Sequence, residues 1–186
     1  LAEKVFNLIE PFAGYAFNKA HSVSYALIAY WTAFFKANYP IEYMTSILNS
    51  YTGQTEKIAN YIRECQHLKI KVLPPDINFG EAAFTIEALE NDQRGIRFGM
   101  AAVKNVGASA VAPFLEAIKQ GGLFVSIEDM CRRASLNNLN RRALESLIKV
   151  GALDSLGNRG SLIAATDRIL SLASTEAKLK VSGQST

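Results

Sequence analysis

The sequence has little from which to build a covalent or metal-bound framework. It contains 2 cysteines and 2 histidines in 186 residues. Cys65 and Cys131 cannot form a disulfide framework, so both are expected to be reduced thiols of a cytoplasmic protein. Structural zinc needs two close pairs of ligands, and the sequence offers a single close pair, Cys65 with His67. These counts exclude a secreted disulfide scaffold and argue against a zinc site.

The sequence also lacks a membrane segment and a secretion signal. Its longest uncharged run, residues 20–35, is interrupted by polar residues and ends at Lys36, whereas a membrane helix needs about 20 predominantly apolar residues. No N-terminal stretch has the basic, apolar and small-residue regions of a signal peptide in order. We therefore expect no membrane contact. Because the first residue is Leu1 rather than Met, we expect the chain to be a piece of a longer protein.

No self-contained catalytic constellation is present in the sequence. There is no Gly-x-Ser-x-Gly nucleophile motif and no glycine-rich phosphate loop ending in Lys-Ser/Thr. Acidic pairs such as Asp76 with Glu81 exist, but their spacing does not set them on one helix face. We expect no catalytic residue and no metal ligand in this chain.

Charge is unevenly distributed along the chain. The formal net charge is +3, yet residues 76–130 hold 4 basic and 8 acidic side chains, whereas residues 131–186 hold 9 basic and 4 acidic ones. A basic last third suits an anionic partner such as nucleic acid. The alternative is an ordinary solvated helical face.

The apolar pattern predicts a mainly α chain with one small β hairpin. Residues 22–37 are apolar almost all round, which predicts a helix buried on most faces. Two short strands, 84–87 and 96–98, flank a turn at residues 90–95, which predicts the hairpin. Further helices are expected near residues 1–12, 40–48, 58–68, 110–119, 140–150 and 158–173, and another is expected to follow Ser126 and to carry Met130 and Cys131. Ser126, Asn140 and Asn158 are the expected caps.

Residues 103–111 are similar to a hairpin that grips nucleic acid between two short helices. Such hairpins read apolar-x-Gly-apolar-Gly, and here Asn105 stands at the first glycine while Gly107 keeps the second. Asn is the non-glycine residue that most readily adopts a left-handed conformation, so the turn remains feasible. The N–H groups that open the next helix would then face a phosphate. A plain helix-turn-helix corner is the alternative.

A second candidate turn, residues 149–154, lies in the basic last third. It follows a helix that carries Arg141 and Arg142, and precedes a helix that starts near Arg159. Two such turns in one chain favour binding to a nucleic-acid backbone.

A polar cluster separates the first two expected helices. Tyr15, Asn18, Lys19 and His21 offer an aromatic ring, an amide and cationic groups within one or two helical turns. Together these groups suit a nucleotide. The alternative is a capped turn leading into the next helix, with His21 bonded to a neighbouring carbonyl.

Several blocks of the sequence resemble the bacterial C-family replicative DNA polymerases, the family of the DNA polymerase III alpha subunit. The blocks occur in family order and cover nearly the whole chain. They are FAGYAFNKAHS at residues 12–22, ANYPIEYM at 37–44, LPPDIN at 73–78, GMAAVK at 99–104, LNRRALESLI at 139–148 and GALD at 151–154.

This resemblance implies fingers helices followed by a small β hairpin and tandem helix-hairpin-helix motifs. Residues 1–52 would be the distal part of the fingers, and residues 53–157 a DNA-binding helix-hairpin-helix region with the β hairpin near residues 84–98. Residues 158–186 would be a C-terminal helix and tail leading to a clamp-binding segment. The palm, whose aspartates bind Mg²⁺ in the family, would lie upstream and outside this chain.

The resemblance further implies a part of a DNA-directed DNA polymerase that is inactive alone. Its expected partners are primer–template DNA, a deoxynucleoside triphosphate, and the sliding clamp and other replisome subunits bound by the full-length protein. A free-standing helix-hairpin-helix module and a helical protein-interaction domain are the alternatives. The residues matched for the nucleotide are Tyr15, Asn18, Lys19 and His21, and those expected to contact DNA are Lys104, Asn105, Gly107, Ser109, Arg141, Arg142, Lys149, Gly151 and Arg159.

Overall fold

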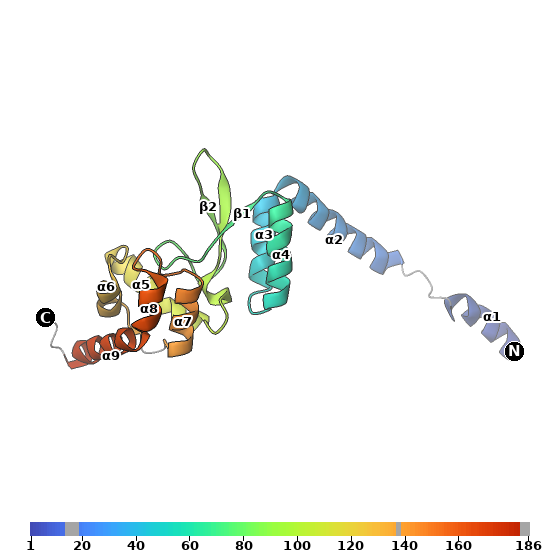
Figure 1. Ribbon diagram of the computed structural model, residues 1–186. Coiled ribbons are helices and arrows are strands. Elements are labelled where there is room, and N and C mark those ends of the chain that lie inside the picture. The colour runs from blue at the N-terminus through green and yellow to red at the C-terminus, as the bar shows by residue number, and fades with distance from the viewer. Residues whose placement is uncertain (14–18, 137–138, 183–186) are drawn as a thin grey trace. The chain divides into compact units, whose positions relative to one another are not determined.

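The computed structural model describes residues 1–13, 19–136 and 139–182 of the chain. The chain divides into two compact units, Leu1–Pro40 and Ile41–Thr186. Helices predominate in both, and the second unit adds a small sheet (Figure 1). This confirms the prediction of a mainly α chain. No helix in the described part of the chain is long and apolar enough to cross a membrane.

The first unit contains two helices, α1 (Ala2–Ala13) and α2 (Lys19–Asn38). The prediction that α2 is buried on most faces is wrong for the described residues, because none of the side chains of this helix is buried. Trp31, for example, is 51% exposed. The aromatic contacts of α2 lie within the helix, such as that between the rings of Tyr30 and Phe34 at 6.2 Å, or reach Tyr39 just beyond its end, and they leave the rings of Tyr30, Phe34 and Tyr39 exposed.

The second unit begins with a helical pair and a three-stranded sheet. Its helices are α3 (Pro40–Ser50) and α4 (Thr55–His67). The strands are β1 (Lys71–Leu73), β2 (Thr85–Ala88) and β3 (Arg94–Arg97), in the order β1-β3-β2. β2 and β3 are antiparallel and form the predicted hairpin, while β1 pairs in parallel with β3.

Side chains of α3 and α4 pack on the sheet to form one of two apolar cores. Asn49 of α3 fixes this packing, because its amide donates to the Phe84 carbonyl at 2.9 Å and accepts from the Phe84 N–H at 2.8 Å. The buried members of this core are Ile41, Met44, Leu48, Ile58, Cys65, Ile70, Phe84 and Ile96.

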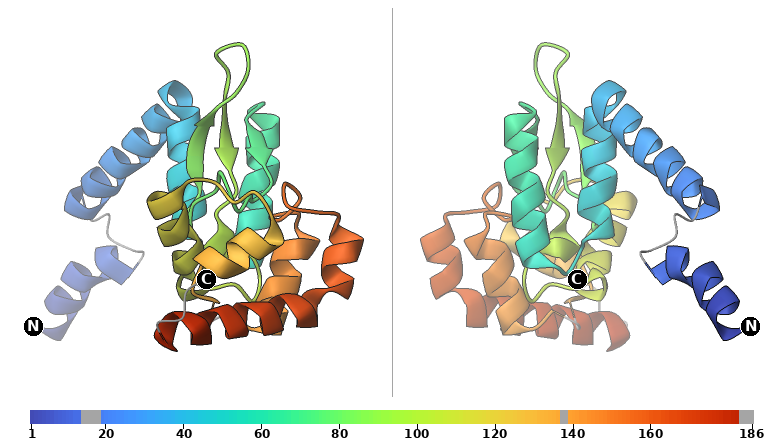
Figure 2. Two further views of the ribbon diagram at one scale, coloured as in Figure 1. Left: turned by 90° about the vertical axis from the view of Figure 1, so that its left-hand side faces the viewer. Right: turned by 90° about the vertical axis from the view of Figure 1, so that its right-hand side faces the viewer.

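A 3₁₀ turn, η1 (Met100–Ala102), leads from the sheet into the second core of this unit. The helices around that core are α5 (Ala108–Gly121), α6 (Ile127–Arg133), α7 (Arg141–Lys149), α8 (Arg159–Ala164) and α9 (Thr166–Ser182). Figure 2 shows the tip of the β2–β3 hairpin at the opposite end of this unit from α9. Phe98, which follows β3, packs against both cores.

The ends of the later helices follow the predicted caps. A side-chain oxygen accepts a backbone N–H at the start of α6, α7 and α8, which stabilises each first turn. The capping bonds run from Asp129 to Ser126 at 3.1 Å, from Ala143 to Asn140 at 2.9 Å and from Gly160 to Asn158 at 2.9 Å. The helix predicted over residues 158–173 is divided in two at Ala165, where α8 ends and α9 begins at Thr166.

Candidate nucleic-acid interface

The first hairpin connects η1 to α5 through residues 103–107. Asn105 has φ +69°, which confirms the prediction that this asparagine takes the left-handed conformation of a hairpin glycine. Gly107 has φ −104° and ψ 166°, an extended conformation open to any residue. A Cβ on Gly107 would meet only the Ser109 hydroxyl, at 3.9 Å. The backbone in front of α5 is therefore uncrowded, so another molecule could approach it closely.

The N-terminus of α5 differs from those of α6, α7 and α8. No side chain among the described residues caps it, whereas α6, α7 and α8 each have a capping side chain. Gly107, Ala108 and Ser109 are all exposed. Uncapped N–H groups at a helix start carry partial positive charge and accept anions, so this end of α5 can receive a phosphate oxygen.

A side-chain hydrogen bond joins the first hairpin to α7. The Asn105 amide Nδ2 donates to the Ser146 hydroxyl oxygen at 3.2 Å, across 41 residues of sequence. The first hairpin is thereby connected to α7, the helix that leads into the second candidate turn. Sequence reasoning did not select Ser146, because no local pattern shows which residue faces Asn105 in the fold.

The second turn, residues 149–154, is built around Gly151. This glycine is buried and has φ +86°. Arg159 Nε donates to Asp154 Oδ1 at 2.7 Å, and Arg159 Nη2 to Asp154 Oδ2 at 2.6 Å. A Cβ on Gly151 would collide with this ion pair, reaching Asp154 Oδ2 at 2.8 Å. Both the backbone conformation and the paired side chains therefore require glycine here.

The backbone N–H groups of the second turn are largely used inside the fold. Those of Gly151 and Ala152 donate to carbonyls of α7, both at 3.0 Å, and that of Asp154 donates to the Gly151 carbonyl at 3.1 Å. At the start of α8, the Asn158 side chain accepts from Gly160 and Ser161. The second turn thus offers fewer free donors to a phosphate than the first.

Three of the cationic residues expected to contact DNA are paired within the protein. Besides the Arg159 pair, Arg141 contacts Glu145 at 2.8 Å and Asp167 at 2.7 Å. Lys149 contacts Glu145 at 3.4 Å. Hydrogen bonds from Arg141 and then Lys149 lower the pKa of Glu145, and those from Arg159 lower the pKa of Asp154. Sequence reasoning missed Asp167 as a partner of Arg141, because this pair spans 26 residues. It also assigned Arg159 to DNA without considering Asp154, five residues earlier, as its partner.

Arg142 and Lys104 are different from these paired cations. Both are exposed, and neither has a hydrogen bond or ion pair with any residue that the structure describes. Arg142 precedes Ser146 by four residues on α7, which places the two on one face of that helix. Lys104 is adjacent to Asn105, so the Asn105–Ser146 bond brings the segments carrying both free cations together.

The residues expected to bind a nucleotide belong to the first unit. Tyr15 and Asn18 lie outside the described residues. Lys19 and His21 are exposed in the first turn of α2, and the His21 ring centroid lies 4.3 Å from that of Tyr25. The described part of the chain therefore shows Lys19 and His21 close together. Nucleotide binding by the four residues stays a prediction.

The described residues also have no evident centre for metal or thiol chemistry. No group of three or more His, Cys, Asp or Glu residues among them could hold a metal ion. The residues that the structure describes therefore do not fit the Mg²⁺ site of a polymerase palm. The resemblance places that palm outside the chain. Burial raises the pKa of the Cys65 and Cys131 thiols to about 11 each, so both remain protonated and unreactive near neutral pH.

Comparison with known proteins connects this architecture to a family. The chain is 42% identical over 142 residues to the DNA polymerase III subunit alpha of Escherichia coli (strain K12), which is 76% of this chain and 12% of that protein. It is 44% identical over 140 residues to the subunit alpha of Saccharopolyspora erythraea, 75% of this chain and 11% of that protein. The chain thus spans only about an eighth of the relatives' length.

A family profile described as a helix-hairpin-helix motif matches residues 69–162. That range runs from the end of α4 to α8, and so includes both hairpins, the Asn105–Ser146 bond and the Asp154–Arg159 pair. It covers just over half of the chain. On this match, together with the paired hairpins of the second unit, the chain belongs to the helix-hairpin-helix family.

Proposed function

We propose that the chain is part of a replicative DNA-directed DNA polymerase, in which its helix-hairpin-helix region holds duplex DNA by the sugar–phosphate backbone. The single observation that carries this proposal is the first hairpin. There, left-handed Asn105 turns the chain into an α5 N-terminus with no side-chain cap among the described residues. Backbone N–H groups at such a terminus suit a phosphate oxygen and read no base, so binding is independent of sequence.

The extent of the similarity favours a polymerase part over a free-standing helix-hairpin-helix module. The match to the subunit alpha relatives covers 142 residues, whereas the motif profile spans residues 69–162. A free-standing module would share only the hairpin region. The residues encoded upstream of Leu1 would separate the two, because only a polymerase would carry palm aspartates there.

The DNA-binding proposal is tested by fluorescence anisotropy with two duplexes of unrelated sequence across about 50 to 200 mM salt. We expect equal affinities for both duplexes and a linear fall of log affinity with log salt, since each neutralised phosphate contributes a slope of about −0.9. A strong preference for one duplex, or no binding at the lowest salt, would contradict the proposal.

A nucleotide role for the segment before α2 forms the second part of the proposal. Tyr15, Asn18, Lys19 and His21 would contact the incoming deoxynucleoside triphosphate, with Tyr15 against the sugar or base and Lys19 as a point charge toward the phosphates. The similarity to subunit alpha and the exposure of Lys19 and His21 support it. The full-length enzyme is the place for its test, because the rest of the pocket lies outside this chain.

In the parent polymerase, Mg²⁺ would assist nucleotidyl transfer. The resemblance places the ligands of this ion upstream of the chain, and we propose that the chain itself contributes substrate positioning and binding to duplex DNA. We expect no primer extension by the isolated chain with Mg²⁺ and all four nucleotides, and measurable incorporation would overturn this division of roles. The sliding clamp and other replisome subunits would be partners of the full-length protein in the cytoplasm. The clamp-binding segment would follow residues 158–186.

A further inference from the structure

The two neighbouring arginines at the start of α7 have opposite environments. Arg141 Nε and Nη1 lie 2.8 Å and 2.7 Å from carboxylate oxygens of Glu145 and Asp167. Arg142 is exposed without an ion pair or hydrogen bond to any described residue. Withdrawing Arg141 toward a ligand would break its ion pairs with Glu145 and Asp167 and leave Glu145 with Lys149 alone, whereas Arg142 loses no such contact with a described residue by turning outward.

We propose that Arg142, not Arg141, is the arginine of the second motif that contacts DNA, and that it acts beside Lys104 of the first hairpin on one stretch of backbone. The inference rests on the proposed backbone binding and assigns its cationic contacts. On this proposal the two hairpins do not bind DNA independently, each through its own cations. They share one contact surface. We call this surface, made of Lys104 and Arg142, the composite grip.

The Asn105–Ser146 hydrogen bond holds together the two segments that carry the composite grip. It ties the residue after Lys104 to the residue one helical turn beyond Arg142. Side chains four apart on a helix are neighbours on one face, so Arg142 lies on the face of α7 that meets the first hairpin. An arginine side chain is long enough to reach across one helical turn, which brings its guanidinium and the Lys104 ammonium within range of neighbouring phosphates.

The positive charges of the composite grip are unpaired among the described residues and favour binding of an anion. Lys149, three residues beyond Ser146, is paired with Glu145, and Glu145 is shared with Arg141. No carboxylate among the described residues forms an ion pair with Lys104 or Arg142. Two uncompensated cations held on adjoining segments repel each other, and a polyanion that neutralises both releases its own counterions.

The test compares single variants of the 186-residue chain by the salt dependence of duplex binding. Arg142→Ala should reduce the log–log slope by about 0.9, because one phosphate contact is lost. Lys104→Ala should do the same, and the double variant should lose about 1.8. Arg142→Lys keeps the charge and should keep most of the slope. Arg141→Ala is the matched control and should leave the slope unchanged.

The melting temperature, together with the pattern of salt slopes, distinguishes the possible failures. The melting temperature of Arg142→Ala should equal that of the parent, because its side chain has no partner among the described residues. If the parent binds DNA with a steep slope but Arg142→Ala binds identically, the composite grip is wrong and the proposed function stands. If Arg141→Ala lowers the slope and Arg142→Ala does not, the assignment is reversed. If the parent does not bind, the proposed function itself fails.

Discussion

Asp154 and Arg159 face each other across the turn that starts at Gly151, and their ion pair closes over the α-carbon of that glycine. Two hydrogen bonds of 2.7 Å and 2.6 Å fix the guanidinium against the carboxylate. The arginine that a basic sequence segment offers to DNA thus serves to hold the second turn. The geometry of this turn therefore depends on residue size at position 151 as well as on charge.

Gly151→Ala should destabilise the second unit by about 2–4 kcal/mol. About 1 kcal/mol or more of this comes from a Cβ in the left-handed region, and the rest from displacing the Arg159 guanidinium. Urea unfolding followed by circular dichroism measures the change. Gly53→Ala is the control, because Gly53 has φ +90° but a Cβ there would meet no heavy atom within 4 Å. Equal losses for the two variants would show that the ion pair yields without cost.

Asp154 should make stability depend on pH in the acid range. Hydrogen bonds from Arg159 lower its pKa in the folded state, so its contribution is complete above the unfolded pKa of about 3.9 and is lost as the pH falls through the lowered folded value. The free energy of unfolding should therefore decline below about pH 5. Asp154→Asn should flatten this decline, whereas Asp92→Asn, at the exposed turn of the β hairpin, should not. A parallel decline in both variants would contradict the assignment.

Arg133 should be a cation on which folding of the second unit depends strongly. Its guanidinium donates to the Ala117 carbonyl at 2.8 Å, to the Leu123 carbonyl at 3.1 Å and to the Gly122 carbonyl, and it pairs with Asp129 at 2.9 Å. These bonds close the C-terminal end of α5. Because charged hydrogen bonds contribute more than neutral ones, Arg133→Met should cost about 2–4 kcal/mol.

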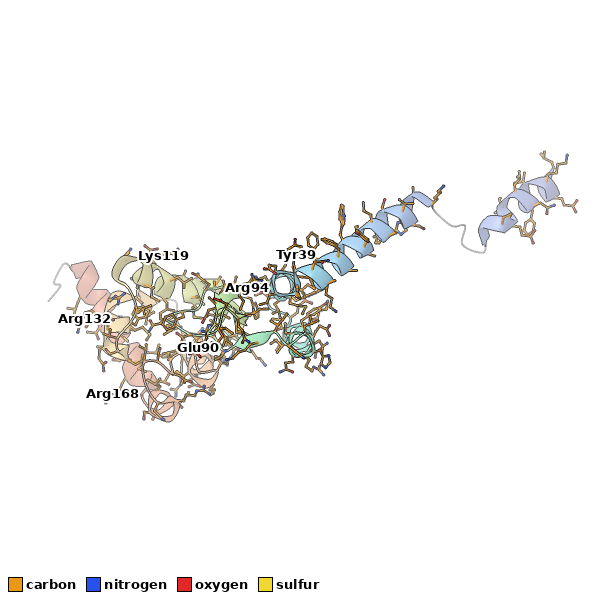
Figure 3. The ribbon with its side chains drawn as sticks, turned by 90° about the horizontal axis from the view of Figure 1, so that it is seen from above. Tyr39, Glu90, Arg94, Lys119, Arg132 and Arg168 are labelled. Carbon is orange, nitrogen blue, oxygen red and sulfur yellow. The ribbon has the colours of Figure 1, made fainter. Side chains whose placement is uncertain are left out.

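The neighbouring Arg132 provides the matched control for this prediction. It is exposed on α6, where Figure 3 labels it. Arg132→Met should change the free energy of unfolding by about 0.5 kcal/mol or less. Comparable losses for Arg132→Met and Arg133→Met in thermal unfolding would show that the carbonyl contacts of Arg133 do not stabilise the fold.

In the full-length polymerase, His21→Ala or Lys19→Ala should impair use of the nucleotide. Loss of one charge-assisted contact of about 1.5–3 kcal/mol should raise the KM for nucleotide or lower kcat by about tenfold or more. Steady-state primer extension measures both constants. Lys4→Ala on α1 is the control and should retain parental kinetics. If the His21 and Lys19 variants lose only thermal stability, the segment is a capped turn leading into α2 and not a nucleotide contact.

Local features of the second unit could be predicted from the sequence. Left-handed Asn105, the caps Ser126, Asn140 and Asn158, and the β hairpin each depend on residues within a few positions of one another. Intrinsic preferences of Asn and Ser for turns and caps decide these features, so they can be predicted from the sequence without knowledge of the tertiary structure.

Features that depend on distant partners could not be predicted. The bond between Asn105 and Ser146 and the pair between Arg141 and Asp167 join segments 41 and 26 residues apart. A count of basic residues over 131–186 therefore overstates the positive charge available to DNA. The expected burial of α2 failed for a related reason: apolar composition shows that a helix favours burial, but not which surface covers it.

Phe98 has a consequence for how the second unit comes apart. The ring packs against the core under α3 and α4 and also against the core among α5 to α9, and its centroid lies 4.7 Å from that of Phe84. Neither core can open without stripping apolar contacts from the other. We therefore expect the helical pair beside the sheet and the helix-hairpin-helix region to unfold together in one cooperative transition rather than one after the other.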